Sequence, residues 1–405
     1  MSYEIQQAKE LVVKAGKELI EKGLIARTWG NVSARISDTQ FVITPSGRAY
    51  EDLTPDEIVV VNIDDCSYEG DIKPSSEKGV HAACYRHHPT VDFVIHTHQK
   101  AATIVSITGM EIRNVYDEFR PVLGDKVPCA AYAMSTTDSL RKKVEMCIMM
   151  NPNSRAIMMM HHGTVCMGDS YEHAFALAEN LEKCCEKVIK DNYLRHSWAK
   201  TYNDEDKRNY FLGKKGCPKM PDAIPDLGKS VRNGNTFTLT VGGKSVDVDI
   251  ETGVGINGIP PKVEKLHRAI YNTEDCTFIR QLASPDVVAV SQTDEGMTPM
   301  IDDFAQIVGT DVKNVAWVDG DTDACAKEAG EAIDQRNAVL VQGAGALITG
   351  NTEGDLQALE IIMDKACQAV IDVDIFNRIH YVPKLECMLM RTVYLAKYSK
   401  KIDEK

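Results

Sequence analysis

The sequence predicts an α/β protein that contains two copies of one domain. Short apolar strands alternate with amphipathic helices along the 405 residues, which is the pattern of α/β folds. The segment 156–189 matches the segment 338–371 at a constant offset of 182 residues, and nine positions are identical. A polar stretch rich in Gly and Pro, 201–225, predicts a linker. We therefore expect a first domain over residues 1–200 and a second over residues 226–405.

The composition argues against several classes of partner. The formal net charge of −13 disfavours nucleic acid and anionic membranes, because both bind basic surfaces. The twelve cysteines form no Cys-x-x-Cys pair, which favours reduced thiols in a reducing compartment. We find no secretory signal and no apolar run of transmembrane length. We therefore expect a cytoplasmic protein that binds a small molecule.

The N-terminal elements bring glycines and small polar residues together in turns. Apolar residues recur at helical spacing over 3–23, and strands are predicted at 28–35 and 41–47. Backbone N–H groups and neutral side-chain donors in such turns can bind an anion, although ordinary turns have the same composition. The candidate positions in these turns are Gly30, Asn31, Ser46 and Gly47.

A second candidate anion site lies at the predicted start of a helix near residue 77. Ser75 and Ser76 precede Glu77, and free backbone N–H groups with two hydroxyls suit a phosphate. Glu77 also gains from the helix dipole, so a structural capping role is the alternative to a catalytic one. His81 follows Glu77 by one helical turn, and we interpret it as a packing or supporting residue rather than a metal ligand.

Histidines at the ends of two apolar strands predict a metal site. His96 and His98 are two residues apart, so on a strand both imidazoles point to the same face. A third ligand would complete a catalytic metal site with one open position, whereas two solvent-facing histidines are the alternative. A second strand runs into His161 and His162. His162 is the favoured third ligand because Gly163 permits close backbone approach, and His161 is its rival.

The second half keeps the pattern of the first half but loses its histidines. Nine of the eleven histidines precede residue 200. A hand alignment pairs the segment 91–94 with the segment 285–288. We therefore expect the second copy to be structural and to lack metal ligands. The predicted replacements are Val290 for His96, Gln292 for His98 and Ala344 for His162.

Five short motifs occur in the order typical of one family. They are Gly30-Asn31, Thr44-Pro45-Ser46-Gly47, Pro74-Ser75-Ser76-Glu77, His96-Thr97-His98 and His161-His162-Gly163. With them, residues 1–200 resemble the class II aldolase/adducin family, most closely its L-fuculose-phosphate-type aldolases, and residues 255–400 resemble a degenerate copy. The resemblance implies a three-layer α/β/α domain with a mixed central sheet. It also implies Zn²⁺ or another divalent metal, with Glu77 as the acid/base residue. The implied metal ligands are His96, His98 and His162.

The resemblance implies the remaining site residues as well. Family aldolases use a tyrosine of a neighbouring subunit as a second acid. Tyr116 lies one place from the expected position, which Asp117 occupies, and we expect Tyr116 to take this role. We also expect a homo-oligomer, either a dimer or a tetramer. The residues implied to hold the substrate phosphate are Gly30, Asn31, Ser46, Gly47, Ser75 and Ser76.

The predicted reaction is retro-aldol cleavage of a phosphorylated ketose. The products are a dihydroxyacetone phosphate-like enediolate, whose charge a Lewis-acid metal stabilises, and an aldehyde. Glu77 would move the proton at the enediolate carbon. A pentulose-phosphate 4-epimerase or a dehydratase can use the same site, but such epimerases typically carry Asp where this chain has Glu77. A non-catalytic, adducin-like binding protein is the further alternative, and adducin-type copies lack the metal histidines.

Overall fold

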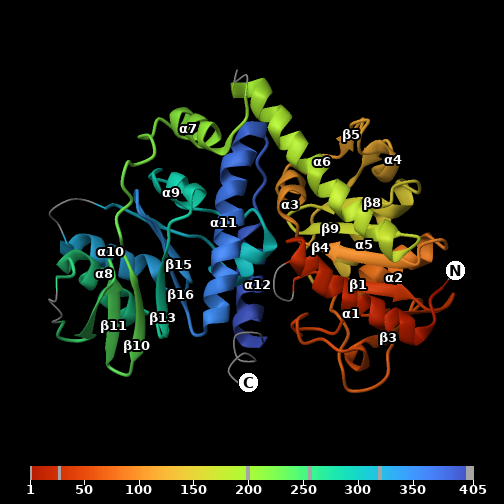
Figure 1. The fold of residues 1–405 in the computed structure, drawn as a ribbon, viewed down its shortest axis with the longest axis horizontal. Coiled ribbons are helices and arrows are strands. Elements are labelled where there is room, and N and C mark those ends of the chain that lie inside the picture. Colours follow the sequence, from red (N-terminus) through yellow and green to blue (C-terminus); the bar gives the residue numbers. More distant parts are fainter. Residues whose placement is uncertain (1, 26–28, 198–200, 254–257, 318–321, 398–405) are drawn as a thin grey trace. The chain divides into compact units, whose positions relative to one another are not determined.

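The computed structural model describes residues 2–25, 29–197, 201–253, 258–317 and 322–397 (Figure 1). Thr28, the first residue of a predicted strand, lies outside these ranges. The chain divides into two compact units, Met1–Asn192 with Arg378–His380, and Tyr193–Asn377 with Tyr381–Lys405. Among the described residues, no helix combines the length and the apolar character needed to cross a membrane.

The first unit is built on a mixed seven-stranded sheet in the order β3-β2-β1-β4-β9-β8-β7. All neighbouring strands are antiparallel except β7 and β8, which are parallel. A separate two-stranded sheet pairs β5 (Ile112–Arg113) with β6 (Lys126–Val127). The strands of the large sheet are β1 (Asn31–Arg35), β2 (Gln40–Ile43), β3 (Val59–Asn62), β4 (Phe93–Thr97), β7 (Cys129–Ala130), β8 (Ala156–Met159) and β9 (Gly163–Gly168).

Helices cover both faces of this sheet, which confirms the predicted three-layer fold (Figure 1). Helices α2 and α5 pack on each other and share an apolar core with alternate strand residues such as Val94 and Val165. Helix α1 contacts β1 and β2, and α3 contacts β8 and β9. The carboxylate of Glu4 accepts hydrogen bonds at the start of α1 and so fixes where this helix begins. The helices are α1 (Ile5–Glu21), α2 (Lys78–His87), α3 (Lys100–Ile107), α4 (Arg120–Leu123), α5 (Asp138–Met150) and α6 (Tyr171–Ser197), with a 3-10 turn at Pro55–Glu57.

The second unit repeats this sheet strand by strand, in the order β12-β11-β10-β13-β16-β15-β14, and so confirms the predicted duplication. Among the described strands of this sheet, β14 and β15 are the one parallel pair, and they correspond to β7 and β8. The strands are β10 (Lys229–Asn233), β11 (Thr236–Val241), β12 (Lys244–Asp249), β13 (Phe278–Leu282), β14 (Asn314–Val315), β15 (Ala338–Val341) and β16 (Gly345–Gly350). The helices are α7 (Asp204–Lys215), α8 (Pro261–Thr273), α9 (Pro285–Ser291), α10 (Thr322–Ile333), α11 (Glu353–Phe376) and α12 (Lys384–Lys397), with a π-helical turn at Phe304–Val308.

Strand register shows which residues of the two units correspond. Gly168 pairs with Phe93 in the first unit, and Gly350 pairs with Phe278 in the second. Because Gly168 and Gly350 are equivalent at the offset of 182, β13 is the counterpart of β4. The counterparts of His96, His98 and His162 are therefore Gln281, Ala283 and Ala344.

The predicted counterparts Val290 and Gln292 are wrong. Val290 lies in helix α9, which follows β13 as α3 follows β4, and Gln292 caps the end of that helix. The error arose because the short apolar run 287–290 fits a buried helix as well as a buried strand.

A helix also occupies part of the stretch that we expected to be a linker. The side chain of Asn203 accepts a hydrogen bond from Asp206 N (2.8 Å) and caps the start of α7.

Candidate functional site

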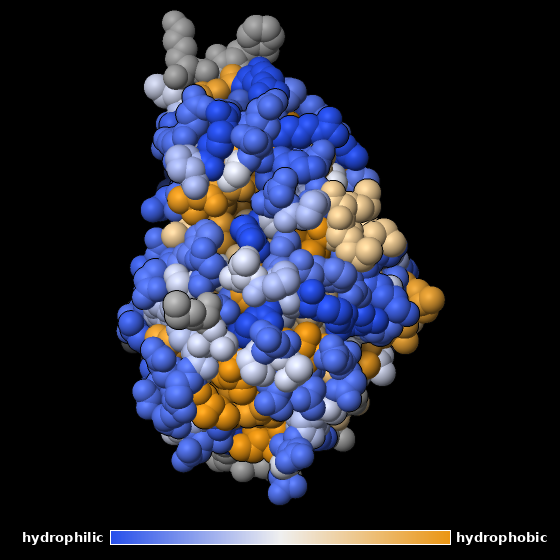
Figure 2. All heavy atoms as spheres, turned by 90° about the vertical axis from the view of Figure 1, so that its right-hand side faces the viewer, coloured by the Kyte–Doolittle hydropathy of each residue, from blue (hydrophilic) through white to orange (hydrophobic). Residues whose placement is uncertain are grey.

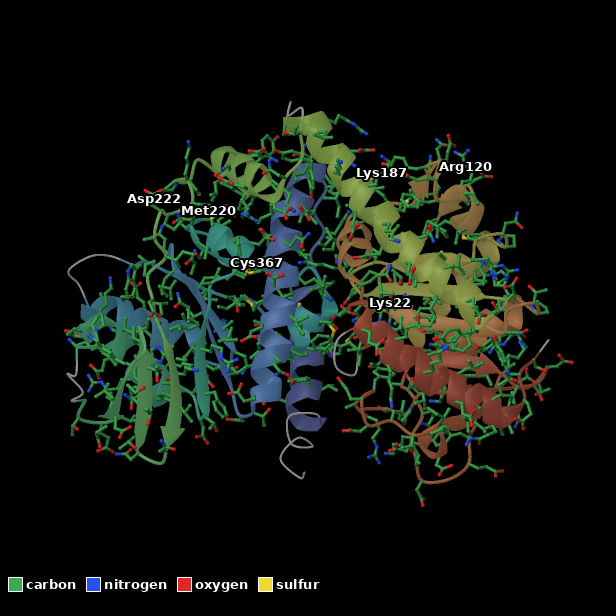
Figure 3. The ribbon with its side chains drawn as sticks, in the orientation of Figure 1. Lys22, Arg120, Lys187, Met220, Asp222 and Cys367 are labelled. Carbon is green, nitrogen blue, oxygen red and sulfur yellow. The ribbon has the colours of Figure 1, made fainter. Side chains whose placement is uncertain are left out.

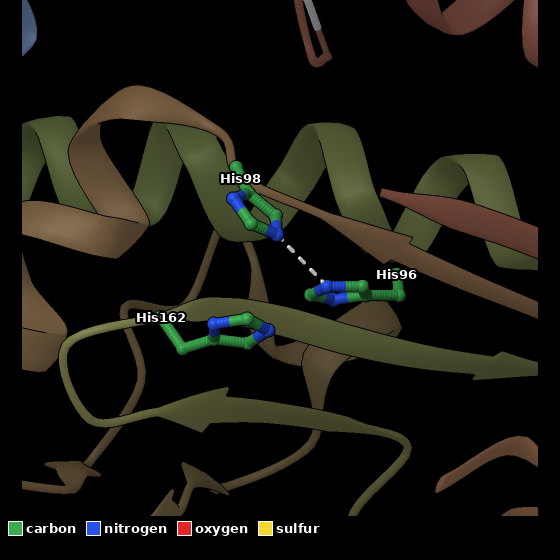
Figure 4. Close-up of side chains that lie close together, drawn as sticks. All are labelled: His96, His98 and His162. Carbon is green, nitrogen blue, oxygen red and sulfur yellow. Dashed lines mark hydrogen bonds between the residues drawn. The ribbon is translucent and has the colours of Figure 1, made fainter. Parts of the chain in front are cut away.

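Three histidines converge at one end of the first sheet (Figure 4). His96 lies on β4, His98 follows the end of that strand, and His162 lies in the turn between β8 and β9. Their candidate ligand atoms all lie within 4.8 Å of one another. The adjacent strands β4 and β9 make this possible, because they bring together residues more than sixty positions apart. Among the described residues, no other group of His, Cys, Asp and Glu side chains has this geometry.

The nitrogens of these histidines fit a divalent cation. His96 Nδ1 lies 2.8 Å from the carbonyl oxygen of Thr164, which can only accept a hydrogen bond. The proton of the neutral ring is therefore on Nδ1, and Nε2 is left with a lone pair. His98 Nε2 lies 3.0 Å from His96 Nε2 (Figure 4). Three convergent imidazole nitrogens are the protein ligands of one class of catalytic zinc site, in which a further coordination position takes water or substrate.

The turn between β8 and β9 selects His162 rather than His161. His161 has a positive φ of 66°, and its ring packs edge-on against Tyr132 at a centroid distance of 5.1 Å. His162 then points toward His96, with stacked rings 5.0 Å apart. A Cβ on Gly163 would lie only 2.2 Å from the carbonyl oxygen of Thr97. Glycine is therefore required at this position, where the backbone at Gly163 lies close to that of Thr97.

Glu77 lies at the start of α2 and faces the histidines. Its Oε1 is 2.9 Å from His162 Nε2, and its Oε2 is 3.1 Å from His96 Nε2. Burial raises the pKa of Glu77, but the positive charge that His162 and His96 carry when protonated outweighs this effect and lowers the pKa well below its ordinary value. The carboxylate makes no capping hydrogen bond to α2, so the alternative capping role is not observed. A buried, ionised carboxylate beside three ligand nitrogens can exchange a proton with a molecule held there.

Two polar loops meet beside Glu77. Ser46 N donates to the carbonyl oxygen of Lys73 (2.9 Å), and Ser75 N donates to that of Thr44 (3.0 Å). Gly47 has a positive φ of 72°, which favours glycine in this turn. Ser46, Gly47 and Ser76 are exposed, whereas Ser75 is buried. The structure therefore brings together the two segments that the sequence suggested as anion sites.

Gly30 and Asn31 lie at the junction between these loops and β4. Gly30 has a positive φ of 91°, and a Cβ there would lie 2.5 Å from the carbonyl oxygen of His96. Its backbone carbonyl accepts a hydrogen bond from Tyr50 Oη (2.9 Å). The Asn31 side chain is buried, and its Nδ2 donates to Glu77 Oε2 (3.0 Å). Gly30 thus has a packing role, and the Asn31 amide is turned toward the carboxylate.

A chain of buried polar side chains continues from Asn31 into the core. His81 Nε2 lies 2.5 Å from Asn31 Oδ1, and His81 Nδ1 lies 2.6 Å from Ser33 Oγ. Ser33 Oγ lies 2.7 Å from Tyr85 Oη. His81 was predicted to be a supporting residue, but Ser33 and Tyr85 were not identified from the sequence. The available signal was their presence in both copies, because His267-Arg-Ala-Ile-Tyr271 repeats the His81–Tyr85 pattern.

Tyr116 lies in the turn between β5 and α4. Its ring packs edge-on against Phe119 at a centroid distance of 6.3 Å. The ammonium group of Lys187 on α6 lies 4.7 Å from the centre of the Tyr116 ring. Lys187 and Arg120, the first residue of α4, are labelled in Figure 3. Asp117, the neighbouring candidate, forms an ion pair with Arg120 (2.7 Å).

The corresponding position in the second unit is filled by hydrogen bonds within the protein. Gln281, the counterpart of His96, accepts a hydrogen bond from Leu227 N (2.8 Å). Its Nε2 donates to the carbonyl oxygens of Pro225 (2.7 Å) and Ala344 (2.8 Å). At the position equivalent to His96, this glutamine amide is therefore bonded to the surrounding backbone on both its oxygen and its nitrogen.

Sugar-phosphate aldolases and an epimerase are among the known proteins that this chain resembles. A 5-methylthioribulose-1-phosphate/5-deoxyribulose-1-phosphate aldolase of Escherichia coli is 35% identical over 187 residues, which cover 46% of this chain and 85% of the relative. An L-fuculose phosphate aldolase of Escherichia coli is 34% identical over 165 residues, covering 41% of this chain and 74% of the relative. An L-ribulose-5-phosphate 4-epimerase of Salmonella choleraesuis is 37% identical over 126 residues, which cover 31% of this chain and 55% of the relative.

The sequence model named Class II Aldolase and Adducin N-terminal domain matches this chain twice. The matched residues are 10–189 and 238–371, one region in each unit. Together the two regions cover more than half of the chain. The chain therefore belongs to the class II aldolase and adducin N-terminal domain family.

Proposed function

We propose that this protein is a metal-dependent aldolase that cleaves a phosphorylated ketose. The products are a dihydroxyacetone phosphate-like enediolate and an aldehyde. One observation carries the proposal: His96, His98 and His162 converge on one point, and the Glu77 carboxylate lies within 3.1 Å of two of them. The sugar-phosphate aldolases among the relatives support the same reaction class.

The residues around the site have separate roles in the proposed retro-aldol reaction. A divalent cation, held by the three histidines, would act as a Lewis acid toward the charge that develops on the substrate oxygens. In the direction of synthesis, the Glu77 carboxylate takes a proton from the carbon that becomes nucleophilic. In the direction of cleavage, Glu77 returns this proton after the carbon–carbon bond has broken. The low pKa of Glu77 keeps this side chain ready to accept the proton.

We assign the substrate phosphate to the polar loops beside Glu77. Backbone N–H groups and hydroxyls can bind phosphate without a positively charged side chain. The net charge of −13 therefore does not argue against such a site. Tyr116 is proposed as the second acid, acting in the site of a neighbouring subunit. The proposed phosphate-binding residues are Ser46, Gly47, Ser75 and Ser76, together with the backbone at Gly30 and Asn31, because the Asn31 side chain is already bonded to Glu77 and His81.

We propose that the protein forms a homo-oligomer. Met146, Met149 and Met150 lie on one side of α5 and are 56%, 63% and 73% exposed. The face drawn in Figure 2 is largely hydrophilic, with apolar side chains gathered in a few patches. Exposed apolar patches on a helix mark contact surfaces between proteins. Light scattering of the wild type and of Met149→Glu should give a lower mass for the variant, and an equal mass would contradict the use of this surface.

A second candidate function is a pentulose-phosphate 4-epimerase. The epimerase among the relatives supports this alternative, because epimerisation begins with the same carbon–carbon cleavage. The presence of Glu rather than Asp after Ser75 and Ser76 favours the aldolase. The two reactions differ in whether the aldehyde leaves the site, so a trap for free aldehyde separates them.

The test combines metal analysis with product analysis. The wild type and a His96→Ala/His98→Ala variant are analysed for bound metal and assayed with a panel of ketose 1-phosphates and pentulose 5-phosphates. We expect one divalent cation per chain, and release of dihydroxyacetone phosphate, in the wild type only. Epimer formation without free aldehyde would favour the second candidate. A wild type without metal, or with metal and no turnover of any substrate, would contradict the catalytic proposal.

A further inference from the structure

A continuous chain of hydrogen bonds connects Glu77 to the apolar core between α2 and the sheet. It runs from Glu77 through Asn31, His81 and Ser33 to Tyr85. Ser33 and His81 have no exposed surface, and Tyr85 and Asn31 are only 1% and 6% exposed. Water therefore has little access to these groups, and the protein itself determines the direction of every hydrogen bond.

The directions follow from the chemistry of each group. The Glu77 carboxylate can only accept, so the Asn31 amide must donate through Nδ2 (3.0 Å) and accept at Oδ1. His81 must therefore carry its proton on Nε2, because this atom faces Asn31 Oδ1. Burial lowers the pKa of His81 to about 3, so its ring is neutral and Nδ1 is an acceptor. Ser33 then donates to His81 Nδ1 and accepts from Tyr85 Oη, so that every donor points toward Glu77.

Comparison with the second unit shows which of these hydrogen bonds are common to both copies of the fold. Ser230 Oγ lies 2.8 Å from His267 Nδ1 and 2.9 Å from Tyr271 Oη, as in the first unit. His267 Nε2, however, donates to a backbone carbonyl, that of Leu227 (2.7 Å). Gly228 takes the place of Asn31, and Val263 takes the place of Glu77 four residues before the histidine. The Ser-His-Tyr group is thus common to both copies, and only its extension to a carboxylate is specific to the copy with the metal ligands.

We propose that Asn31 and His81 are positioning residues, which hold the Glu77 carboxylate in one orientation toward the three histidines. His81 fixes the orientation of the Asn31 amide, and Asn31 fixes one oxygen of Glu77. The other oxygen then keeps its place beside His162. The inference rests on the proposed function of Glu77 as the group that moves the proton.

The first experiment compares two amide replacements of His81. The longer side chain of His81→Gln can place an N–H near the position of Nε2 and keep the donor to Asn31. The shorter His81→Asn can reach only the Nδ1 side, toward Ser33. We expect kcat of His81→Asn to fall about 10- to 100-fold with unchanged KM and metal content, and His81→Gln to recover most of kcat. Equal loss in both variants would overturn the proposal.

The second unit supplies a matched control. His267→Asn disturbs the same Ser-His-Tyr group where no carboxylate follows. We expect His267→Asn and His81→Asn to lose similar thermal stability, but only His81→Asn to lose kcat. Retention of kcat in His81→Asn would overturn the proposal. If His81→Asn fails to fold, Asn31→Ala tests the hydrogen bond between Asn31 and Glu77. A fall in kcat supports the positioning role, whereas a rise in KM alone contradicts it.

A spectroscopic readout separates this inference from the proposed function. In protein labelled with ¹⁵N-histidine, the ring signals of His81 are assigned by their absence from His81→Asn. We expect the proton on Nε2 in the metal-loaded wild type. A proton on Nδ1 would overturn the hydrogen-bond chain even if the enzyme cleaves sugar phosphates. A proton on Nε2 in a protein that cleaves none would instead contradict only the proposed function.

Discussion

At the scale of single residues, Glu77 has the most demanding environment in the first unit. It is buried, it lies beside two imidazoles, and an amide holds one of its oxygens. A buried charge without such partners would cost several kcal/mol. This arrangement keeps Glu77 ionised at neutral pH and directs it at the place where the three histidines converge.

Replacement of Glu77 by glutamine should stop the reaction without loss of the metal. Glutamine has the same shape but cannot accept a proton, so we expect kcat to fall by about 10²- to 10⁴-fold. Steady-state kinetics with parallel metal analysis checks this outcome. As a control, Glu179→Gln changes a partly exposed carboxylate that pairs with Lys22 (labelled in Figure 3) and should leave kcat unchanged. A Glu77→Gln enzyme with wild-type kcat would contradict the role of the carboxylate.

The buried His267 should make the second unit sensitive to acid. Burial lowers the pKa of His267 to about 4, from an ordinary value of 6.5. Between these two pKa values, His267 binds a proton in the unfolded chain but not in the folded chain. The free energy of unfolding is therefore full above the unfolded pKa and falls as the pH falls toward the folded pKa. We expect the free energy of unfolding to fall by about 3 kcal/mol from this residue between about pH 7 and about pH 4. Urea unfolding at several pH values should show a shallower pH dependence for His267→Asn, and an equal dependence would contradict the assignment.

At the scale of secondary-structure elements, a buried ion pair holds helix α7 against α11. Lys207 Nζ lies 2.9 Å from Asp372 Oδ1, and these side chains are 1% and 0% exposed. Lys215 and Glu295 also form an ion pair (2.8 Å), but their side chains are 28% and 62% exposed. The ion pairs that attach α7 therefore include one that is shielded from water and one that is not.

Removal of Asp372 should destabilise the protein far more than removal of Glu295. Asp372→Ala leaves the buried Lys207 ammonium group with only the more distant carboxylate of Asp204 (3.6 Å), so we expect a loss of about 3–5 kcal/mol in the free energy of unfolding. Glu295→Ala breaks an exposed pair and should cost at most about 1 kcal/mol. Urea titrations of the two variants check this difference. Equal losses would mean that Lys207 finds other partners or reaches water.

At the scale of the whole molecule, each unit has its own sheet and its own apolar core, but only the first has a cluster of metal-ligand type among the described residues. In the second, Gln281 fills the equivalent position with hydrogen bonds to the backbone. A cation held by the three histidines would therefore stabilise the first unit directly.

Chelation of the metal should loosen the first unit selectively. A ligand present at about 100 times its dissociation constant stabilises the native state by about 2.7 kcal/mol, and this contribution disappears when the ligand is removed. We expect faster hydrogen exchange in peptides from 93–98 and 156–168 after chelation, measured by mass spectrometry. The His98→Ala variant, which lacks one ligand, should show no further change on chelation. Equal acceleration in peptides from 278–282 and 338–350 would contradict a single metal site.

Several features could be predicted from the sequence because they depend on local spacing. The side-chain period of a strand puts His96 and His98 on one face, and a glycine beside His162 indicates close packing. The repeat at an offset of 182 residues predicted the duplicated sheet. Each of these features can be predicted from residues close together in the sequence, or by comparing one segment of the sequence with another.

Other features were decided only by the tertiary structure. His161 and His162 are adjacent, and the positive φ of His161 is what turns His162 toward the cluster. The true counterpart of His96 became clear from the pairing of β13 with β16, since the apolar run of α9 resembles a strand. The hydrogen bonds from Glu77 to Tyr85 join residues of three separate elements, β1, α2 and the loop before α2. Register, turn conformation and buried polar contacts depend on residues far apart in the chain, so local patterns do not determine them.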